Sequence, residues 1–483
     1  MTYILQEFWP LLTAAITFFL AISASGHALI YKRDSRSAVG WVGLIWLAPI
    51  VGALLYLLLG INRVRRKASD LRAIEPVTLT PQSEFVCEPA TLRDTLDADN
   101  LHLLEMARLG ACLTNLDLLA GNAIEPLQNG DAAYPAMLDA IANARRSITL
   151  TTYIFDNDPV GREFVEALAA AVARGVAVRV LIDAVGARYS LPPITQRLRS
   201  RGVRVARFMP HFLPWTTPYL NLRSHRKIMV VDGHTGFTGG MNIRVGNCLD
   251  RPTPHPVRDL HFRVTGPVVH ELQAIFMEDW QFTTGEKLDD AEWWAPPTRA
   301  GSVMARAIPD GPDKRLDNMR KAFLGALAVA KHQVKVVTPY FLPDAALISA
   351  LNTCAMRGVE VDIVLPAQNN LKWVAWASMA QMWQVLEWGC RVWLTPPPFD
   401  HAKLLVIDSG WSLIGSSNWD PRSLRLNFEF GLECYDATLA RQLESATDER
   451  IAAAQPLTLE QANSRPLPVQ LRDGLARLFS PYL

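Results

Sequence analysis

The chain has 483 residues, of which 49% are hydrophobic and 20% are charged. This length suits roughly two to four domains or one large duplicated domain, with ample apolar material for a core. Its 48 basic and 47 acidic residues nearly cancel, so no overall field draws the chain onto nucleic acid. The six cysteines form no C-x-x-C pair, which argues against a zinc site or a disulfide framework.

The first 67 residues have the composition of a membrane anchor. Residues 8–31 and residues 37–61 contain no Asp, Glu, Lys or Arg. Each run is long enough to cross a bilayer as a helix, which needs about 20 apolar residues. A cleaved signal peptide is the alternative for the first run, but no basic segment precedes it and a second run follows at once. We therefore expect residues 1–67 to form a hairpin of two transmembrane helices.

Basic residues flank the second apolar run on both sides. Three lie in residues 31–37 and four in residues 62–67. Because basic residues stay on the cytoplasmic side of a membrane, the larger cluster places the remainder of the chain in the cytosol. Residues 68–105 are polar, contain three prolines and show no sustained period, so we expect a linker there.

From residue 106 onward the chain repeats one order of elements. Each half shows a strand, a helix and a strand in close succession, and a further helix and strand lead to a polar motif. The matching segments are 144–155, 161–174, 175–183 and 202–207 in the first half, and 330–341, 344–357, 358–365 and 389–393 in the second. This alternation predicts an α/β fold with parallel strands flanked by helices. Glycines and prolines near residues 285–315 separate the halves, which we place at 106–295 and 296–483.

The same motif, H-x-K-x-x-x-x-D, occurs once in each half. An asparagine follows each histidine by 17 residues, and a pair of small residues precedes that asparagine. The repeated residues are His225, Lys227, Asp232 and Asn242 in the first half, and His401, Lys403, Asp408, Ser416 and Asn418 in the second. A single copy would arise by chance in many proteins. Two copies that agree in spacing and in their strand–helix frame predict one active site built from two halves.

The residue types of this motif suit a phosphodiester. On a strand, a histidine and a lysine two positions apart share one face. Lysines and amide donors hold the non-bridging oxygens and stabilise charge in the transition state. One histidine can attack phosphorus while the other protonates the leaving alcohol. We expect Asn242, Asn418 and Ser416 to contact the substrate.

A nucleophilic histidine needs a carboxylate to fix its tautomer. Asp259 and Glu429 each lie in a short alternating segment downstream of a motif. We expect Asp259 to orient the histidine of the first half and Glu429 that of the second. We include Asp232 and Asp408 among the catalytic residues only because they belong to the motif. An aspartate that ends an apolar strand is more often an ion-pair or turn residue.

Further segments extend the paired motif. They are the two apolar N-terminal runs, Tyr153-Ile-Phe-x-x-Asp158, and residues 221–227, 239–243, 415–418 and 420–429. Together they resemble the phospholipase D superfamily and, within it, the bacterial cardiolipin synthases. The resemblance covers nearly the whole chain. It implies two pseudo-symmetric phospholipase D-like sheet domains flanked by helices, preceded by a transmembrane helical hairpin.

The resemblance also implies an activity. A membrane-bound enzyme of this kind would make cardiolipin from two phosphatidylglycerol molecules and release glycerol, through a phosphohistidine and without metal or cofactor. It implies His225 as the nucleophile and His401 as the acid and base, in the bacterial inner membrane as a multi-pass protein. Residues 244–255 depart from the usual synthase pattern, which leaves the acceptor alcohol open. The oligomeric state is also open.

Two alternatives use the same chemistry. A phospholipase D-type phosphodiesterase would hydrolyse the lipid, since water and alcohol can attack the same intermediate. A nuclease would need a basic groove, which the balanced charge and the apolar N-terminus disfavour. A binding protein with a dead duplicated domain is disfavoured because both histidines and both lysines are present.

Two aromatic-rich stretches lie outside the motifs. Residues 208–220 form an apolar, proline-broken segment directly before the first motif, and we expect it to contact the membrane interface. Four tryptophans at positions 373, 376, 383 and 388 lie on the helix expected before the second motif. Aromatic residues at helical spacing are more often core residues, and we expect them in the core.

Overall fold

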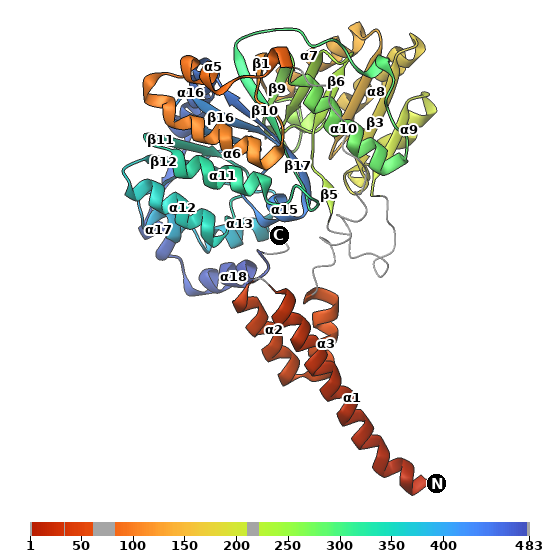
Figure 1. Ribbon diagram of the computed structural model, residues 1–483, viewed down its shortest axis with the longest axis vertical. Helices are drawn as coiled ribbons and strands as arrows, with labels where there is room; N and C mark the ends of the chain where they lie inside the picture. The colour runs from red at the N-terminus through yellow and green to blue at the C-terminus, as the bar shows by residue number, and fades with distance from the viewer. Residues whose placement is uncertain (1, 33, 61–82, 210–221, 481–483) are drawn as a thin grey trace. The chain divides into compact units, whose positions relative to one another are not determined.

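The computed structural model describes residues 2–32, 34–60, 83–209 and 222–480. The chain divides into two compact units, residues 1–70 and residues 71–483, each of which is described by itself (Figure 1). The smaller unit is helical, and the larger one holds the whole of the repeated α/β pattern.

The N-terminal unit consists of a long helix and a broken second arm. Its elements are α1 (Thr2–Tyr31), α2 (Ser35–Leu47), α3 (Pro49–Leu55) and a π-helical turn, η1 (Tyr56–Gly60). By length and composition, one helix among the described residues could cross a membrane, Phe8–Tyr31, with a mean hydropathy of 1.7. α1 packs against both α2 and α3, and the Tyr56 hydroxyl lies 2.8 Å from Nδ1 of His27.

The second of the two expected transmembrane helices is not one continuous helix. Ala48 leaves the helix with φ −141° and ψ 77°, and Pro49 begins the next helix. A residue before proline is driven out of the helical region by the proline ring, so the break follows directly from the sequence. The paired arms of the expected hairpin remain, but the second arm is segmented.

One large sheet organises the second unit, and its strand order shows the duplication. The first half contributes β4 (Arg204–Phe208), β3 (Ala177–Asp183), β2 (Ser147–Thr152), β6 (Ile228–Val231), β7 (Thr235–Gly239), β9 (Leu260–Thr265) and β1 (Leu119–Gln128), in that spatial order. The second half continues with β10 (Val303–Asp310), β17 (Asn427–Tyr435), β16 (Trp411–Gly415), β15 (Leu404–Ile407), β11 (Gln333–Val337), β12 (Glu360–Pro366), β13 (Arg391–Thr395) and β18 (Gln455–Leu457). Apart from the edge strand β18, the second series mirrors the first, and β1 pairs antiparallel with β10 at the junction.

The parallel strands predicted from the repeat are present in both halves. β2, β3 and β4 are parallel to one another, as are β11, β12 and β13. The strands within each motif, β6 and β15, run antiparallel to β2 and β11. The sheet is therefore mixed, with a parallel outer part and an antiparallel inner part in each half.

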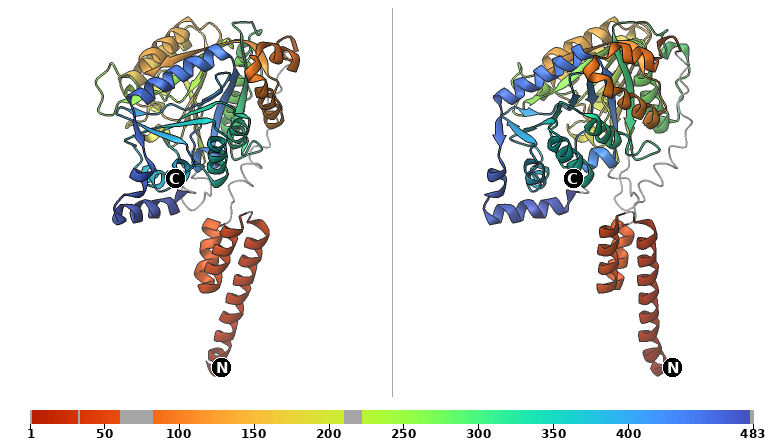
Figure 2. Two further views of the ribbon diagram at one scale, coloured as in Figure 1. Left: turned by 90° about the vertical axis from the view of Figure 1, so that its left-hand side faces the viewer. Right: turned by 60° about the vertical axis from the view of Figure 1, so that its left-hand side comes forward.

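Helices cover both faces of the sheet (Figures 1 and 2). In the first half they are α7 (Asn129–Asn143), α8 (Pro159–Ala173), α9 (Ile194–Ser200) and α10 (Val269–Thr284). In the second half they are α11 (Asn318–Val329), α12 (Ala345–Met356), α13 (Lys372–Met379), α14 (Trp383–Leu386), α15 (Pro421–Arg425), α16 (Ala437–Ala453), α17 (Leu459–Asn463) and α18 (Leu467–Leu478). Short turns of 3-10 helix, η4 (Gly186–Arg188), η6 (Val245–Asn247) and η7 (Ala291–Trp293), complete the described connections between these elements.

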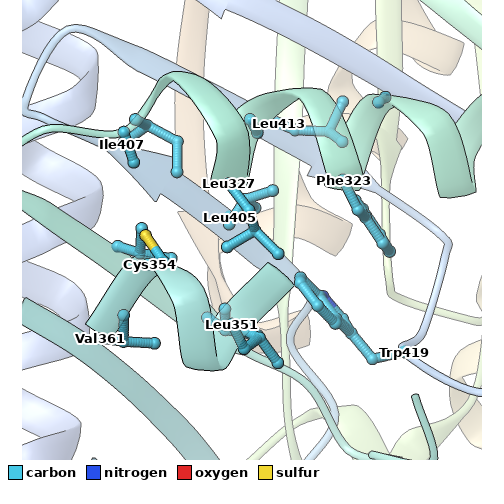
Figure 3. Packing of buried hydrophobic residues seen from close by; sticks show 14 of the residues in the cluster. Phe323, Leu327, Leu351, Cys354, Val361, Leu405, Ile407, Leu413 and Trp419 are labelled. Atoms are coloured by element: carbon cyan, nitrogen blue, oxygen red, sulfur yellow. The ribbon is translucent and has the colours of Figure 1, made fainter. Parts of the chain in front are cut away.

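Three large apolar cores of the described residues hold these layers together. One lies under α7, α8 and α9, and a second under α11 and α12. The third lies beneath α10 and α16 and takes residues from strands of both halves, so it joins them. Figure 3 shows part of the second core, where α11 and α12 meet β12, β15 and β16 through Phe323, Leu327, Leu351, Cys354, Val361, Leu405, Ile407 and Leu413.

The segment before β1 is folded onto the second half. It contains η2 (Ser83–Phe85), α5 (Pro89–Thr95), η3 (Ala98–Leu103) and α6 (Leu104–Thr114). Leu103 and Met106 are buried in the core under α11, and the Arg306 guanidinium donates to the Ala107 carbonyl at 2.8 Å. The described part of the expected linker, residues 83–105, is thus a packed element of the second half.

Candidate active site

Both motifs begin at the same edge of the sheet. His225 and Lys227 directly precede β6, and β6 runs antiparallel to β2. The two residues therefore lie where β2 and its parallel neighbours end. His401 and Lys403 hold the same place relative to β11 through β15. The carboxyl ends of parallel strands are the usual location of ligand sites in open α/β sheets.

A short strand just before each motif pairs with a strand of the other half. β5 (Arg223–Ser224), just before the first motif, pairs in parallel with the start of β17. β14 (Phe399–Asp400), just before the second, pairs in parallel with β8 (Val257–Arg258). The backbone N–H of His225 donates to the Phe428 carbonyl at 2.9 Å, and that of His401 donates to the Arg258 carbonyl at 2.7 Å.

This exchange places each histidine against a carboxylate of the opposite half. Nδ1 of His225 lies 3.1 Å from Oε2 of Glu429, and Nδ1 of His401 lies 2.8 Å from Oδ2 of Asp259. The expectation that each carboxylate serves its own half is therefore wrong. The two residues were identified correctly, but their partners are exchanged, because β5 and β14 cross between the halves.

The electrostatics of the pair fix the tautomer of each imidazole. Burial alone would raise the pKa of Glu429, but its electrostatic interaction and hydrogen bond with His225 and nearby Lys227 bring the pKa below its usual range. Burial likewise opposes ionisation of Asp259, and His401 with Lys403 outweighs it, so this pKa is also lowered. An ionised carboxylate can only accept. Nδ1 of each histidine must then carry the proton, which leaves Nε2 as the nitrogen available to a substrate.

The imidazoles themselves are neutral in the unliganded site. Burial lowers the pKa of His225, partly offset by the charge of Glu429. Burial and then Lys403 lower the pKa of His401 to about 4. A neutral imidazole with a free Nε2 is the form that can act as a nucleophile or a base.

The two lysines lie in the same buried centre. Lys227 Nζ donates to the carbonyl of His225 at 2.6 Å, and Lys403 makes the equivalent bond to the carbonyl of His401 at 2.5 Å. Burial lowers the pKa of Lys227 to about 7 and that of Lys403 to about 8, although Glu429 and Asp259 oppose both shifts. Each lysine also lowers the pKa of the opposite half's histidine. The two motifs and the two carboxylates thus form one electrostatic centre.

Ser416 hydrogen-bonds to the carboxylate that holds His225. Its hydroxyl donates to Oε2 of Glu429, the oxygen that faces His225. The backbone N–H of Phe430 donates back to the Ser416 hydroxyl at 3.0 Å. These contacts tie the hydroxyl to the carboxylate that holds His225, and the contact of Ser416 with a substrate stays a prediction. Its counterpart Gly240 has no room for a side chain, since a Cβ there would lie 2.4 Å from Oδ1 of Asp259.

The two asparagines are buried at the same edge. Asn242 accepts the backbone N–H of Ile154 through Oδ1 at 3.0 Å. Asn418 donates through Nδ2 to the Ser423 hydroxyl at 3.1 Å, and its Oδ1 has no hydrogen-bond partner in the described structure. Their contact with a substrate stays a prediction.

Comparison with known proteins agrees with this arrangement. The family model described as "Cardiolipin synthase, PLD-like domain" matches residues 137–280 and 323–451, one block in each half. A second model, "Phospholipase_D-nuclease N-terminal", matches residues 15–60. The major cardiolipin synthase ClsA of Bacillus subtilis is 30% identical over 96% of this chain and 98% of its own length. Cardiolipin synthase A of Pseudomonas fluorescens strain SBW25 is 33% identical over 97% of each chain.

The chain belongs to the cardiolipin synthase family of the phospholipase D superfamily. It is a phosphatidyltransferase, and phospholipids are its substrates. The crystal structure of phosphatidylserine synthase from Haemophilus influenzae has the same fold, with a TM-score of 0.59 and 18% identity over 78% of this chain and all of that one.

The aspartates that close the two motifs hold backbone at the other end of the strand from the histidines. The Asp232 carboxylate accepts the N–H groups of Arg145, Arg146 and Ser147 at 2.8–2.9 Å. Asp408 accepts three equivalent N–H groups, all at 2.8 Å, from Lys331, His332 and Gln333. Four strand residues lie between each aspartate and its lysine, so the two are five residue steps apart, or about 17 Å of chain. Both aspartates therefore stabilise the fold, which corrects their place in the catalytic set.

Replacement of Asp232 by alanine will lower stability far more than the chemical step. The change leaves backbone donors without their acceptor, at about 1–3 kcal/mol for each one that becomes buried and unsatisfied. It also places an alanine at φ 54°, a left-handed backbone conformation that, among residues with a side chain, asparagine and aspartate tolerate best. We expect the free energy of unfolding to fall by about 3 kcal/mol, as measured by urea denaturation of the detergent-solubilised enzyme.

Asp232→Asn is the matched control for that change. It keeps one acceptor oxygen and tolerates the left-handed backbone, so its loss of stability will be smaller. If Asp232→Ala lowers kcat of the folded enzyme as much as a histidine substitution does, the structural role is contradicted.

Two tyrosines beside the histidines were not predicted as part of the site. The Tyr153 ring meets the His225 ring edge-on with 5.3 Å between centroids, and the Tyr340 ring meets that of His401 at 6.3 Å. Lys227 Nζ also lies 5.8 Å from the centre of the Tyr153 ring. Tyr340 aligns with Ile154 in the repeated strand, so comparison of the halves could not reveal the pair.

A buried arginine ties the first motif to the rest of the fold. The guanidinium of Arg226 makes two hydrogen bonds of 2.8 Å to the Asp279 carboxylate on α10. It also donates to the carbonyls of Glu429 and Asp310. Arg226 thus connects the first motif to two strands of the second half. Its position between a histidine and a lysine of the motif was the available signal, but its partners are distant in sequence.

The remaining expectations about this region have mixed outcomes. Residues 210–220 of the expected membrane-contacting loop lie outside the described residues. The departing segment 244–255 includes η6, where Val245 donates its N–H to Asp158 at 2.5 Å. Among the described residues, no group of three or more His, Cys, Asp or Glu side chains is arranged to hold a metal ion. That the reaction needs no metal stays a prediction.

Proposed function

We propose that the enzyme makes cardiolipin from two molecules of phosphatidylglycerol and releases glycerol, through a phosphohistidine intermediate. The observation that supports this most directly is the pair of imidazoles whose Nδ1 atoms are each held by a buried carboxylate, beside two buried lysines. Such a centre offers one nucleophile, one acid–base group and positive charge for a phosphodiester.

In the proposed first step, Nε2 of His225 attacks the phosphorus of phosphatidylglycerol. A P–N bond forms, the P–O bond to the headgroup glycerol breaks, and the glycerol oxygen takes a proton from Nε2 of His401. This histidine acquires its proton when the anionic substrate binds, because the negative charge raises the low pKa of the free imidazole. Lys227 and Lys403 hold the non-bridging oxygens as charge builds on them.

In the second step, a hydroxyl of another phosphatidylglycerol attacks the same phosphorus. His401 takes the hydroxyl proton, the P–N bond breaks and cardiolipin leaves. Glu429 keeps His225 in the reactive tautomer and supports the positive charge of the phosphohistidine, and Asp259 does the same for His401. Water must be kept out during this step, since it would give phosphatidic acid from the same intermediate.

We further propose that the enzyme lies in the bacterial inner membrane, with α1 as a span and the large unit in the cytosol. The apolar run Phe8–Tyr31 and the basic residues at 62–67 support this orientation. Reporter fusions to the C-terminus test it. A C-terminal phosphatase that is active only outside the inner membrane will be inactive, and an active one would contradict the cytosolic placement.

The decisive experiment supplies the purified full chain in detergent with labelled phosphatidylglycerol. The expected products are cardiolipin and free glycerol, formed equally with and without phosphatidylethanolamine and unaffected by a chelator. Phosphatidic acid as the only lipid product would replace this proposal with hydrolysis. Strong inhibition by the chelator would contradict chemistry without a metal.

Binding of the lipid headgroup will be coupled to proton uptake. The free-site pKa values of Lys227 and Lys403 are about 7 and about 8, and a bound phosphodiester anion favours their protonated forms. Between the free and the bound pKa, binding draws protons from solvent, so affinity falls as pH rises by up to about tenfold per pH unit for each lysine. Calorimetry of His225→Ala with short-chain phosphatidylglycerol, in buffers of different ionisation enthalpy, measures the uptake without turnover. A binding heat at about pH 8.5 that is independent of buffer would contradict the expected uptake.

A further inference from the structure

A row of leucines on α18 faces solvent in the large unit. Leu467, Leu471, Leu475 and Leu478 are 67%, 65%, 53% and 72% exposed. Their spacing of four, four and three residues puts them on one side of a helix. The other side carries the buried residues Asp473 and Ala476. The helix lies at the outer edge of the second half, beyond α12 and α13 (Figures 1 and 2).

Aromatic side chains widen this apolar area. Phe479, just after α18, is 47% exposed, and its ring meets that of Trp373 at 5.9 Å in an edge-on contact. Trp373 and Leu371, at the start of α13, are 49% and 48% exposed. We call these residues the leucine surface: Leu371, Trp373, Leu467, Leu471, Leu475, Leu478 and Phe479. The expectation that the tryptophans of this region are core residues is wrong for Trp373, and also for Trp383 and Trp388, which are 41% and 48% exposed.

A chain of packed side chains connects the buried side of α18 to His401. Ala476 on the buried side of α18 packs with Val374 and Ala377 of α13, and Tyr340 packs against this same cluster. Tyr340 is also the residue whose ring meets that of His401. The outer side of α18 is therefore linked to the active site through α13 and Tyr340.

The charges around the leucine surface indicate what it contacts. Residues 464–480 contain three arginines and a single acidic residue, Asp473. Asp473 is buried and forms ion pairs with Arg465 and Arg472, and the Arg472 guanidinium lies 4.5 Å from the Trp376 ring centre. Arg477 is exposed beside the leucines. An apolar face with a net positive rim suits an anionic lipid surface, whereas two copies face to face would bring their arginines together.

We propose that the leucine surface inserts into the interfacial layer of an anionic bilayer and holds the active-site mouth at the level of the lipid headgroups. A lipid could then reach His225 and His401 without leaving the bilayer fully. The inference rests on the proposed function only in taking a bilayer as the source of substrate. It adds a second membrane contact, made by the large unit itself.

The test measures lipid contact in the full chain. Cys112 is the one exposed cysteine among the described residues, so Cys112→Ser gives a background for a fluorophore on Leu471→Cys. The protein is reconstituted in vesicles of phosphatidylcholine and phosphatidylserine that carry a quencher high on the acyl chain. We expect about a twofold loss of fluorescence, because interfacial helices bury their apolar face about 5–10 Å deep. The matched control is Ser445→Cys, an exposed position on α16, the helix on the opposite sheet face from α12.

Four results decide the inference. Quenching at position 471 that is absent at position 445 and is lost when Leu475→Glu and Leu478→Glu are added supports it. Equal fluorescence with and without quencher at position 471 overturns it, as does equal quenching at both positions. Disulfide formation between two copies through Leu471→Cys also overturns it, since the occupant would then be a second copy. The readout does not depend on turnover, so a negative result leaves the proposed function standing, and a failed synthase assay does not affect the quenching.

Discussion

Replacement of His225 by alanine will lower kcat for phosphatidyl transfer by about 10⁴-fold or more, and replacement of His401 will have an effect of the same order. The first change removes the atom that bonds phosphorus. The second removes the group that protonates the leaving glycerol and deprotonates the acceptor. Because the two residues act as a unit, the double variant will be little worse than either single one.

A substrate with a good leaving group separates the two roles. A nitrophenyl ester of phosphatidic acid needs no acid for departure of the phenol. His401→Ala should release one equivalent of nitrophenol in a burst and then stall, with the phosphatidyl group on His225, whereas His225→Ala should give no burst. The phosphohistidine is identified by mass spectrometry of peptides kept at alkaline pH. A burst from His225→Ala instead would exchange the two assignments, and a burst from neither would contradict the covalent mechanism.

Glu429→Gln and Asp259→Asn will each lower kcat by about 10²–10⁴-fold. In both variants an amide replaces a carboxylate that accepts from Nδ1–H of an imidazole. The amide presents a donor or a weaker acceptor, so the imidazole loses its preferred tautomer and its Nε2 becomes a poorer nucleophile or base. The lost negative charge also removes support for the positively charged form of each ring.

Because each carboxylate contacts the histidine of the opposite half, each of these variants should affect one particular histidine. Glu429→Gln should change the nitrogen chemical shifts and tautomer ratio of His225 and leave those of His401 nearly unchanged, and Asp259→Asn should do the reverse. Each variant is the other's matched control, since both remove one buried carboxylate from the same centre. NMR spectra of enzyme labelled with ¹⁵N in the imidazole rings measure both histidines at once. A change at His401 in Glu429→Gln, with His225 unaffected, would contradict the crossed pairing.

Much of the fold was predictable because local patterns repeat within the chain. The alternation before His225 recurs before His401, so parallel strands flanked by helices could be expected in both halves, and both are present. The second apolar run shows where composition alone fails. Its hydropathy predicted one helix, but Pro49 divides it. The stretch before residue 105 looked like a linker because its apolar residues follow no period, and its core contacts come from the second half.

The sequence by itself determined which residues form the centre: two histidines, two lysines and two carboxylates stand out because the chain carries the pattern twice. It also determined the family, since these motifs are specific. Only the tertiary structure decided how the groups are paired. Sequence distance favours a partner within the same half, but β5 and β14 each hydrogen-bond to a strand of the other half and carry His225 to Glu429 and His401 to Asp259. Neither half can orient its own histidine, so the site exists only when both halves are folded together.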